Sequence, residues 1–163
     1  MHTEKAFIQS IEQHHKIIHK VCNLYMNNEQ DKKDLFQEIV LGAWKGYRHF
    51  KGEAKFSTWL YRVALNTAIT FYRKEKRQVA TAPFKEQYTT LAADVHTDED
   101  EQLTAMNRAI AELSSIDKAL VMLYLEDYNY QDIGEIMGIT ANNVAVKMNR
   151  IKSKLKENTK NYL

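Results

Sequence analysis

The sequence contains few of the residues that break or cross-link a polypeptide. Its 163 residues include one cysteine, one proline and five glycines. A single cysteine excludes an internal disulfide framework and is typical of a reducing compartment. Sheet-rich folds need many turn-forming residues, so the scarcity of glycine and proline predicts an all-helical chain.

Long apolar runs and a targeting signal are missing as well. No stretch approaches the roughly 18 consecutive apolar residues of a transmembrane helix. Residues 1–13 show no apolar segment followed by a small-residue cleavage site, so no secretion signal is expected. The composition, with 44% hydrophobic and 27% charged residues, is that of a globular protein with a core. We therefore expect a cytoplasmic protein.

The chain as a whole has no large excess of either charge, but individual segments do. The chain carries 23 basic and 21 acidic residues. Residues 1–77 hold 14 basic and 8 acidic residues, a net charge of +6. Residues 78–117 hold 2 basic and 8 acidic residues, a net charge of −6. Residues 118–163 hold 7 basic and 5 acidic residues, a net charge of +2. Two basic blocks around an acidic middle indicate a polyanion as partner, although solvated helix faces would give the same pattern.

Apolar residues recur at helical spacing in seven stretches. Three cover residues 3–26, 31–50 and 55–77, and four follow at residues 101–113, 115–126, 130–137 and 141–157. The segment between them contains the proline and the acidic run Asp98–Glu101, so it is predicted to form a flexible linker. The expected architecture is all-α, with a three-helix domain at residues 1–77, an acidic linker at 78–100 and a helix-turn-helix domain at 101–163.

Residues 130–148 have the pattern of a helix-turn-helix. Gly134 is a small residue where two helices must approach closely, and Gly138 stands where a left-handed residue ends the first helix. Thr140 is a suitable N-cap for the second helix. The shared core is predicted to contain Ile133, Met137, Ile139 and Val144. Such a pair can be purely structural, but this spacing and the basic C-terminal segment favour DNA binding.

The second helix of this pair has two distinct faces when its residues are placed about 100° apart. The core face contains Val144, Met148, Ile151 and Leu155. The opposite face contains Asn142, Val146, Asn149, Arg150 and Ser153, with Lys147 and Lys152 on its flanks. The residues predicted to bind DNA are Asn142, Asn143, Val146, Lys147, Asn149 and Arg150. Asparagine and arginine can make paired hydrogen bonds to adenine and guanine edges, while the flanking Lys147 and Lys152 would meet phosphates.

The helix predicted at residues 31–50 combines a broad apolar arc with an acidic face. That face contains Asp34, Gln37 and Glu38, and Leu41 is a large apolar residue among them. One exposed leucine is usually without consequence. Beside acidic residues, however, it can anchor an interface with a basic partner.

The helix that follows Lys55 has two apolar stripes, so it is expected to pack against two neighbours. The strip left open between them contains Arg62, Asn66, Ile69 and Arg73, and it leads to a basic cluster that starts at Lys74. The preceding loop mixes aromatic and basic residues, which suits unstacked single-stranded bases. Composition favours Phe50 and Phe56 as core residues, which leaves the loop backbone to form a base pocket.

These motifs together resemble two conserved regions of bacterial sigma factors. Residues 34–39 (DLFQEI), 43–44 (AW) and 56–66 (FSTWLYRVALN) are similar to region 2, and residues 130–148 are similar to region 4. The short chain, with no domain between the two regions, is typical of the extracytoplasmic function (ECF) class. Because both regions occur in this order, the chain is identified as a member of that family.

The resemblance implies a promoter-specificity subunit that binds core RNA polymerase, recognises the −10 and −35 elements and helps to open the DNA. In this family the first motif binds the clamp helices of the largest catalytic subunit, which maps to Asp34, Gln37, Glu38 and Leu41. The loop and the helix after it capture and hold the single-stranded −10 element, which maps to Lys51, Lys55, Ser57, Arg62, Asn66, Arg73 and Lys74. The region 4 helix reads duplex −35 DNA. An anti-sigma factor is a common further partner in this class.

Other classes stay open from the residues alone. A stand-alone regulator of duplex DNA would explain the helix-turn-helix but would need neither the acidic face nor the Trp59 helix. A metal-dependent helical protein would use His15, His19 and Cys22, at i, i+4 and i+7, to bind Zn²⁺. A fourth ligand is not evident, so we expect no metal and no cofactor. The sequence has no glycine-rich phosphate loop, nucleophile elbow or paired catalytic carboxylates, so we expect no enzyme.

Overall fold

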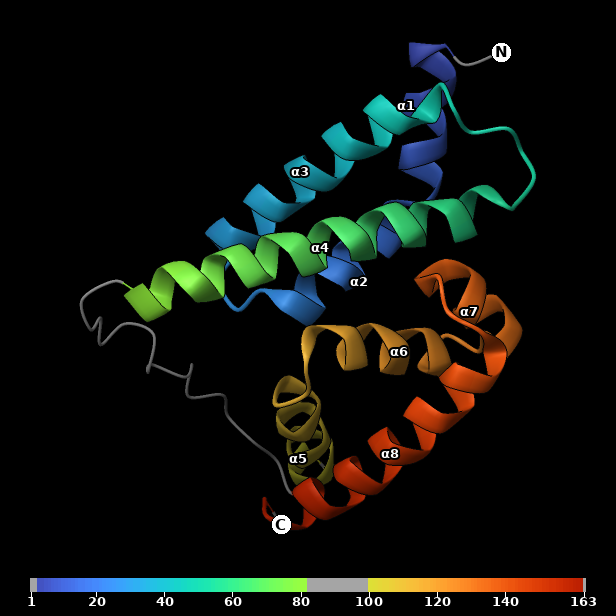
Figure 1. Ribbon diagram of the computed structural model, residues 1–163. Coiled ribbons are helices and arrows are strands. Elements are labelled where there is room, and N and C mark those ends of the chain that lie inside the picture. The colour runs from blue at the N-terminus through green and yellow to red at the C-terminus, as the bar shows by residue number, and fades with distance from the viewer. Residues whose placement is uncertain (1–2, 82–99, 163) are drawn as a thin grey trace. The chain divides into compact units, whose positions relative to one another are not determined.

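A computed structural model describes residues 3–81 and 100–162, except for the side chains of residues 76–81 and 100 (Figure 1). Every regular element within these ranges is an α-helix, which confirms the predicted fold class. The helices fall into two compact units, one formed mainly by residues 1–73 and the other mainly by residues 74–135 and 139–163. None of the described helices is long and apolar enough to cross a membrane.

The first unit contains four helices, namely α1 (Glu4–Gln13), α2 (His15–Tyr25), α3 (Glu29–Tyr47) and α4 (Phe56–Thr81). The single helix predicted for residues 3–26 is wrong, because the chain leaves the helical conformation at His14. This residue has φ −121° and ψ 16°, and its Nδ1 lies 2.8 Å from the carbonyl oxygen of Ser10. Its ring lies 5.0 Å from that of Phe56, a distant contact that local helix propensity does not reveal.

Two glycines of α3 lie beside side chains of α4. A β-carbon on Gly42 would lie 3.6 Å from Thr67 Oγ1, and one on Gly46 would lie 3.5 Å from Trp59 Cζ2. Side chains of α4 therefore occupy the space directly over both glycines. The fully buried residues of the unit include Ile18, Val21, Leu35, Ile39, Leu60 and Leu65.

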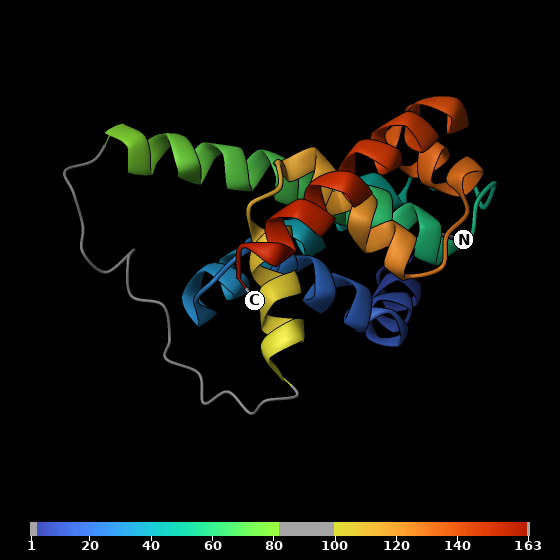
Figure 2. The ribbon, with the colours of Figure 1, turned by 90° about the horizontal axis from the view of Figure 1, so that it is seen from below.

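Helix α4 is longer than predicted, because it continues to Thr81 instead of ending at Arg77. Residues 78–81 contain no helix breaker, and the proline comes at position 83. Because the residue before a proline disfavours the helical conformation, the sequence favours a helix end close to Thr81. The last turns of α4 extend past the other helices of the first unit in both views (Figure 1, Figure 2). Of the linker predicted at residues 78–100, residues 82–99 lie outside the described residues.

The second unit contains α5 (Asp100–Ala111), α6 (Ser115–Leu125), α7 (Tyr130–Met137) and α8 (Ala141–Lys160). Helix α8 packs against both α5 and α6. Three of the helices start with a side chain that accepts a hydrogen bond from a free backbone amide, which satisfies a donor at the helix end. The pairs, at 2.8–3.2 Å, are Ser114 with Asp117, Asn129 with Asp132 and Thr140 with Asn143.

A left-handed residue ends α6 before the turn to α7. Asp127 has φ 66°, and its amide donates a 3.1 Å hydrogen bond to the carbonyl oxygen of Tyr124. The amide of Tyr128 donates a 3.2 Å hydrogen bond to the carbonyl oxygen of Leu123. These two bonds form a Schellman motif, in which the left-handed position is usually glycine because an L side chain is strained there.

Candidate nucleic-acid and protein interfaces

The turn between α7 and α8 has the geometry of a helix-turn-helix. Gly138 has φ 76°, the left-handed conformation predicted for it. A β-carbon on Gly134 would lie 2.5 Å from the carbonyl oxygen of Ile139, closer than real β-carbons approach. The Thr140 hydroxyl accepts a 3.1 Å hydrogen bond from the amide of Asn143, so it caps α8. All three predictions for this turn are confirmed.

The core beneath this turn differs in part from the prediction. Ile133 and Val144 are fully buried as expected, whereas Met137 and Ile139 are only half-buried. Ile136, which the sequence analysis missed, is 2% exposed. It lies three residues after Ile133 and therefore shares its helix face, a spacing that identifies it in hindsight.

The exposed face of α8 carries the residues predicted to read base edges. The opposite face is buried at Val144, Met148 and Ile151, and half-buried at Leu155. Lys147 is half-buried at the flank, and the exposed residues are Asn142, Asn143, Val146, Asn149, Arg150 and Ser153. Val146 is 44% exposed, so its methyl groups are accessible to a thymine methyl group. Amide and guanidinium donors around one apolar side chain form a set suited to base edges in a major groove.

Lys152, the other flanking lysine, contacts two tyrosines. Its Nζ lies 4.5 Å from the ring centroid of Tyr124 and 3.5 Å from the hydroxyl of Tyr130. Hydrogen bonding to Tyr124 and then to Tyr130 raises the pKa of Lys152. Lys152 thus links α8 to the end of α6 and the start of α7.

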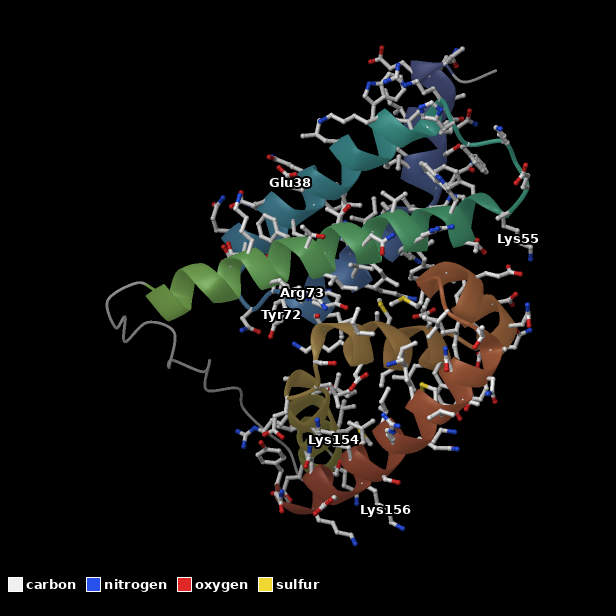
Figure 3. All side chains as sticks on the ribbon, viewed as in Figure 1. Glu38, Lys55, Tyr72, Arg73, Lys154 and Lys156 are labelled. Carbon is white, nitrogen blue, oxygen red and sulfur yellow. The ribbon has the colours of Figure 1, made fainter. Side chains whose placement is uncertain are left out.

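The exposed face of α3 is acidic and has an apolar centre. Asp34, Gln37 and Glu38 are exposed, and Leu41 is 53% exposed. Figure 3 shows Glu38 on the side of α3 that faces away from α4. The amide nitrogen of Gln30 donates a 3.0 Å hydrogen bond to Asp34 Oδ1, which orients this carboxylate on the face.

Trp44 extends this face and was not predicted. Its side chain is 42% exposed, and its ring lies 5.1 Å from that of Phe7 on α1. It follows Leu41 by three residues, so the two apolar side chains are neighbours on the helix surface. The spacing alone could have identified it.

An aromatic cluster anchors the loop at residues 48–55 between α3 and α4. The ring of Phe50 lies 5.8 Å from that of Phe56, 5.3 Å from that of Trp59 and 6.3 Å from that of Tyr47. Phe50 and Phe56 are half-buried, so these rings pack mainly on one another. The loop itself contains Gly52 with φ 74° and the exposed Lys51 and Lys55, with Ser57 half-buried just after it. Lys55 projects outward at the start of α4 (Figure 3).

A row of polar side chains follows along α4. Arg62, Asn66, Arg73 and Lys74 are exposed, over about 18 Å of helix at 1.5 Å per residue. Ile69, which the sequence placed in the same open strip, is 7% exposed and so is buried. Of the residues predicted for this strip, only the polar ones are therefore exposed.

The three residues considered for zinc separate into two environments. His15 and His19 are exposed, and their ring centroids lie 5.6 Å apart. Cys22 is 2% exposed, and its burial raises the pKa of the thiol to about 11. Within residues 3–81 and 100–162, no group of three His, Cys, Asp or Glu side chains is arranged to hold a metal ion.

The sequence matches two protein-family descriptions over most of its length. It matches Sigma-70 region 2 over residues 10–78 and Sigma-70, region 4 over residues 103–155. It is 28% identical over 151 residues to the ECF RNA polymerase sigma factor SigM of Mycobacterium tuberculosis, covering 92% of this chain and 75% of that protein. It is 26% identical over 166 residues to the ECF RNA polymerase sigma factor SigW of Bacillus subtilis, covering 94% of this chain and 89% of that protein.

Two solved structures share the fold. The sigma factor RpoE of Bartonella quintana, in complex with the anti-sigma factor NepR, superposes with a TM-score of 0.74 at 20% identity over 96% of this chain and 98% of that chain. CnrH, in complex with the cytosolic domain of CnrY, superposes with a TM-score of 0.66 at 17% identity, over 95% of this chain and 88% of that chain.

Proposed function

We propose, from the premise that this chain belongs to the sigma-70 family as a sigma factor of the ECF class, that its two helical units act as the two promoter-reading parts of RNA polymerase. The observation that carries the proposal is the match to region 2 and region 4 in one chain and in that order. We assign residues 1–77 to a region 2-like domain, residues 78–100 to a linker and residues 101–163 to a region 4-like domain. The chain is the promoter-specificity subunit of the enzyme.

The exposed face of α3 binds core RNA polymerase in this proposal. Asp34, Gln37 and Glu38 supply negative charge and hydrogen bonds, and Leu41 supplies the apolar anchor at 53% exposure. An apolar residue surrounded by polar ones is the usual composition of an interface centre and rim. The opposite side of the helix is buried at Leu35 and Ile39, so the face presented to a partner is fixed by packing.

The loop and the polar row on α4 hold the single-stranded −10 element. The aromatic cluster fixes both ends of the loop, so its backbone and Ser57 form the wall for a flipped base, and Lys51 and Lys55 attract the phosphates. Arg62, Asn66, Arg73 and Lys74 then follow the strand along α4. Positive side chains in a row along a groove or helix are the usual support for a single strand.

The exposed face of α8 reads the duplex −35 element. Asn142, Asn143, Val146, Asn149 and Arg150 face base edges, and Lys147 contacts phosphate.

A stand-alone duplex-binding regulator is not favoured, because neither the region 2 match nor the acidic face of α3 has a role in it. We propose action in the cytoplasm without enzymatic activity, since nucleotide chemistry belongs to the polymerase. Similarity to a sigma factor bound by the anti-sigma factor NepR supports an anti-sigma factor as a further partner.

A titration of core polymerase with an α3 variant tests the proposal. Asp34→Lys with Glu38→Lys reverses two exposed charges, which changes stability little but sets like charges against each other at the interface, at a cost of several kcal/mol. We expect the affinity for core polymerase to fall at least about a hundredfold. The control is Glu4→Lys with Glu12→Lys, which makes the same charge change at two exposed residues of α1. Unchanged affinity of the α3 variant would overturn the assignment of this face.

A further inference from the structure

Two histidines on α2 stand one helical turn apart and belong to none of the surfaces assigned above. His15 and His19 are both exposed, with ring centroids 5.6 Å apart and ring planes at 83°. Residues at i and i+4 lie on the same side of a helix. The same spacing presents two histidines to one zinc ion in metalloprotease helices.

We propose that His15 and His19 form a two-ligand surface site for an exchangeable divalent transition-metal ion of the class Zn²⁺, Ni²⁺ or Cu²⁺. Imidazole nitrogens suit these ions, whereas Mg²⁺ and Ca²⁺ prefer oxygen ligands. A zinc ion at about 2.0–2.1 Å from each nitrogen, with tetrahedral angles, needs the two nitrogens about 3.3 Å apart. Histidines at i and i+4 reach this separation in metalloprotease helices, where both bind one zinc ion. The other coordination positions face solvent and take water.

The neighbouring side chains restrict the site to this pair. Cys22, the next residue along the same side of α2, is buried and stays protonated because burial raises its pKa to about 11. The ring of His14 is held by the carbonyl of Ser10 and by Phe56. Lys16 and Lys20 each follow a histidine by one residue, about 100° around the helix, so they flank the pair and their positive charges lower its affinity for a cation.

Metal binding at this pair would stabilise the first unit. Helix α2 begins at His15 without a side-chain cap, and an ion that joins His15 to His19 ties its first turn to the second. An ion that binds the folded chain but not the unfolded one shifts unfolding by mass action, so occupancy should raise the Tm. His19 also has a packing role, because its ring lies 4.9 Å from that of Phe36 on α3.

The test is a calorimetric titration of the full-length chain, without a histidine tag, with NiCl₂ and separately with ZnCl₂. Thermal unfolding followed by circular dichroism accompanies each titration. We expect one saturable ion per chain and a rise in Tm. His15→Ala and His19→Ala should each weaken binding at least tenfold and remove the rise in Tm. His49→Ala, which removes an exposed histidine from the loop before α4, is the matched control and should behave like the wild type.

Three results would overturn the proposal. One is equal binding by His15→Ala and the wild type, and another is an equal loss in His49→Ala. The third is the same rise in Tm with MgCl₂, which would indicate a general ionic effect. If His19→Ala unfolds for loss of its contact with Phe36, His15→Ala and His15→Gln carry the test.

Discussion

The amide of Ile139 donates a 2.9 Å hydrogen bond to the carbonyl oxygen of Gly134, and the carbonyl oxygen of Ile139 lies only 2.5 Å from the position that a β-carbon on Gly134 would take. This close approach of backbone to backbone lies in the turn between α7 and α8, directly before the helix that carries Arg150.

Enlarging Gly134 should therefore open the turn. Gly134→Leu forces a side chain against backbone, which we expect to lower the stability of the second unit by about 1–3 kcal/mol. Gly134→Ala should cost less, because only a β-carbon meets the carbonyl oxygen of Ile139, whereas both variants regain a similar helix propensity of about 1 kcal/mol. Urea denaturation measures both variants. Gly42→Ala is the control, since its nearest neighbour stands at 3.6 Å; an equal loss of stability there would contradict the account.

Removing the backbone strain at the left-handed residue after α6 should raise the stability of the second unit. Asp127→Gly keeps the Schellman bonds and removes the strain at φ 66°, so we expect a gain of about 0.5–1 kcal/mol. Asp127→Ala removes the carboxylate but keeps the β-carbon and should bring no gain. Thermal unfolding of the two variants distinguishes strain from charge, and a gain in both would show that the carboxylate is responsible.

Alkaline pH should destabilise the first unit through Cys22 and Tyr25. Burial raises the pKa of the Cys22 thiol from 9.0 to about 11, and burial, with Tyr72 adding to it, raises that of Tyr25 as well. In the unfolded chain the Cys22 thiol ionises above about pH 9, whereas in the folded chain it holds its proton to about pH 11. Stability should therefore be constant below pH 9 and should fall between pH 9 and 11. Urea midpoints across this range measure it, and Cys22→Ala with Tyr25→Phe should flatten the decline; an unchanged slope would refute the cause.

Two residues of α8 should affect DNA binding in different ways. Arg150→Ala should cost roughly 1–3 kcal/mol on a matching −35 element and little on a shuffled one, because a base contact is lost. Lys147→Ala should weaken both sequences alike and lower the salt slope of binding by about 1. Competition binding of the polymerase holoenzyme to the two promoters compares them, with Lys5→Ala on α1 as a control on the first unit. Equal losses for Arg150→Ala on both sequences would refute its base-reading role.

Local patterns predicted most of the fold, because their causes lie within a few residues. Gly134 allows a close backbone approach, Gly138 takes the left-handed conformation and Thr140 caps α8. Each role depends on residues within one or two helical turns, and all three predictions are confirmed. The break at His14 could not be predicted, because the ring that it packs against belongs to Phe56, far along the chain. Helical periodicity placed the faces of α3 and α8, but it missed the exposed Trp44 on α3 and the buried Ile136 on α7.

The role of those faces could not come from periodicity, since an exposed acidic or basic face has the same spacing whatever it binds. Lys152 illustrates the limit. Its angle on α8 suggested a phosphate contact, yet Tyr124 and Tyr130, from other helices, hold its ammonium group. The contacts of a flexible side chain depend on which helices pack beside it.

Run-off transcription with purified core RNA polymerase on fragmented genomic DNA tests the central claim most directly. The account predicts that adding this chain yields discrete transcripts from a limited set of fragments, which core polymerase alone does not make. It further predicts that Asp34→Lys with Glu38→Lys abolishes these transcripts and that Glu4→Lys with Glu12→Lys does not. The same transcripts with and without the chain, at concentrations where it saturates the enzyme, would contradict its assignment as a promoter-specificity subunit.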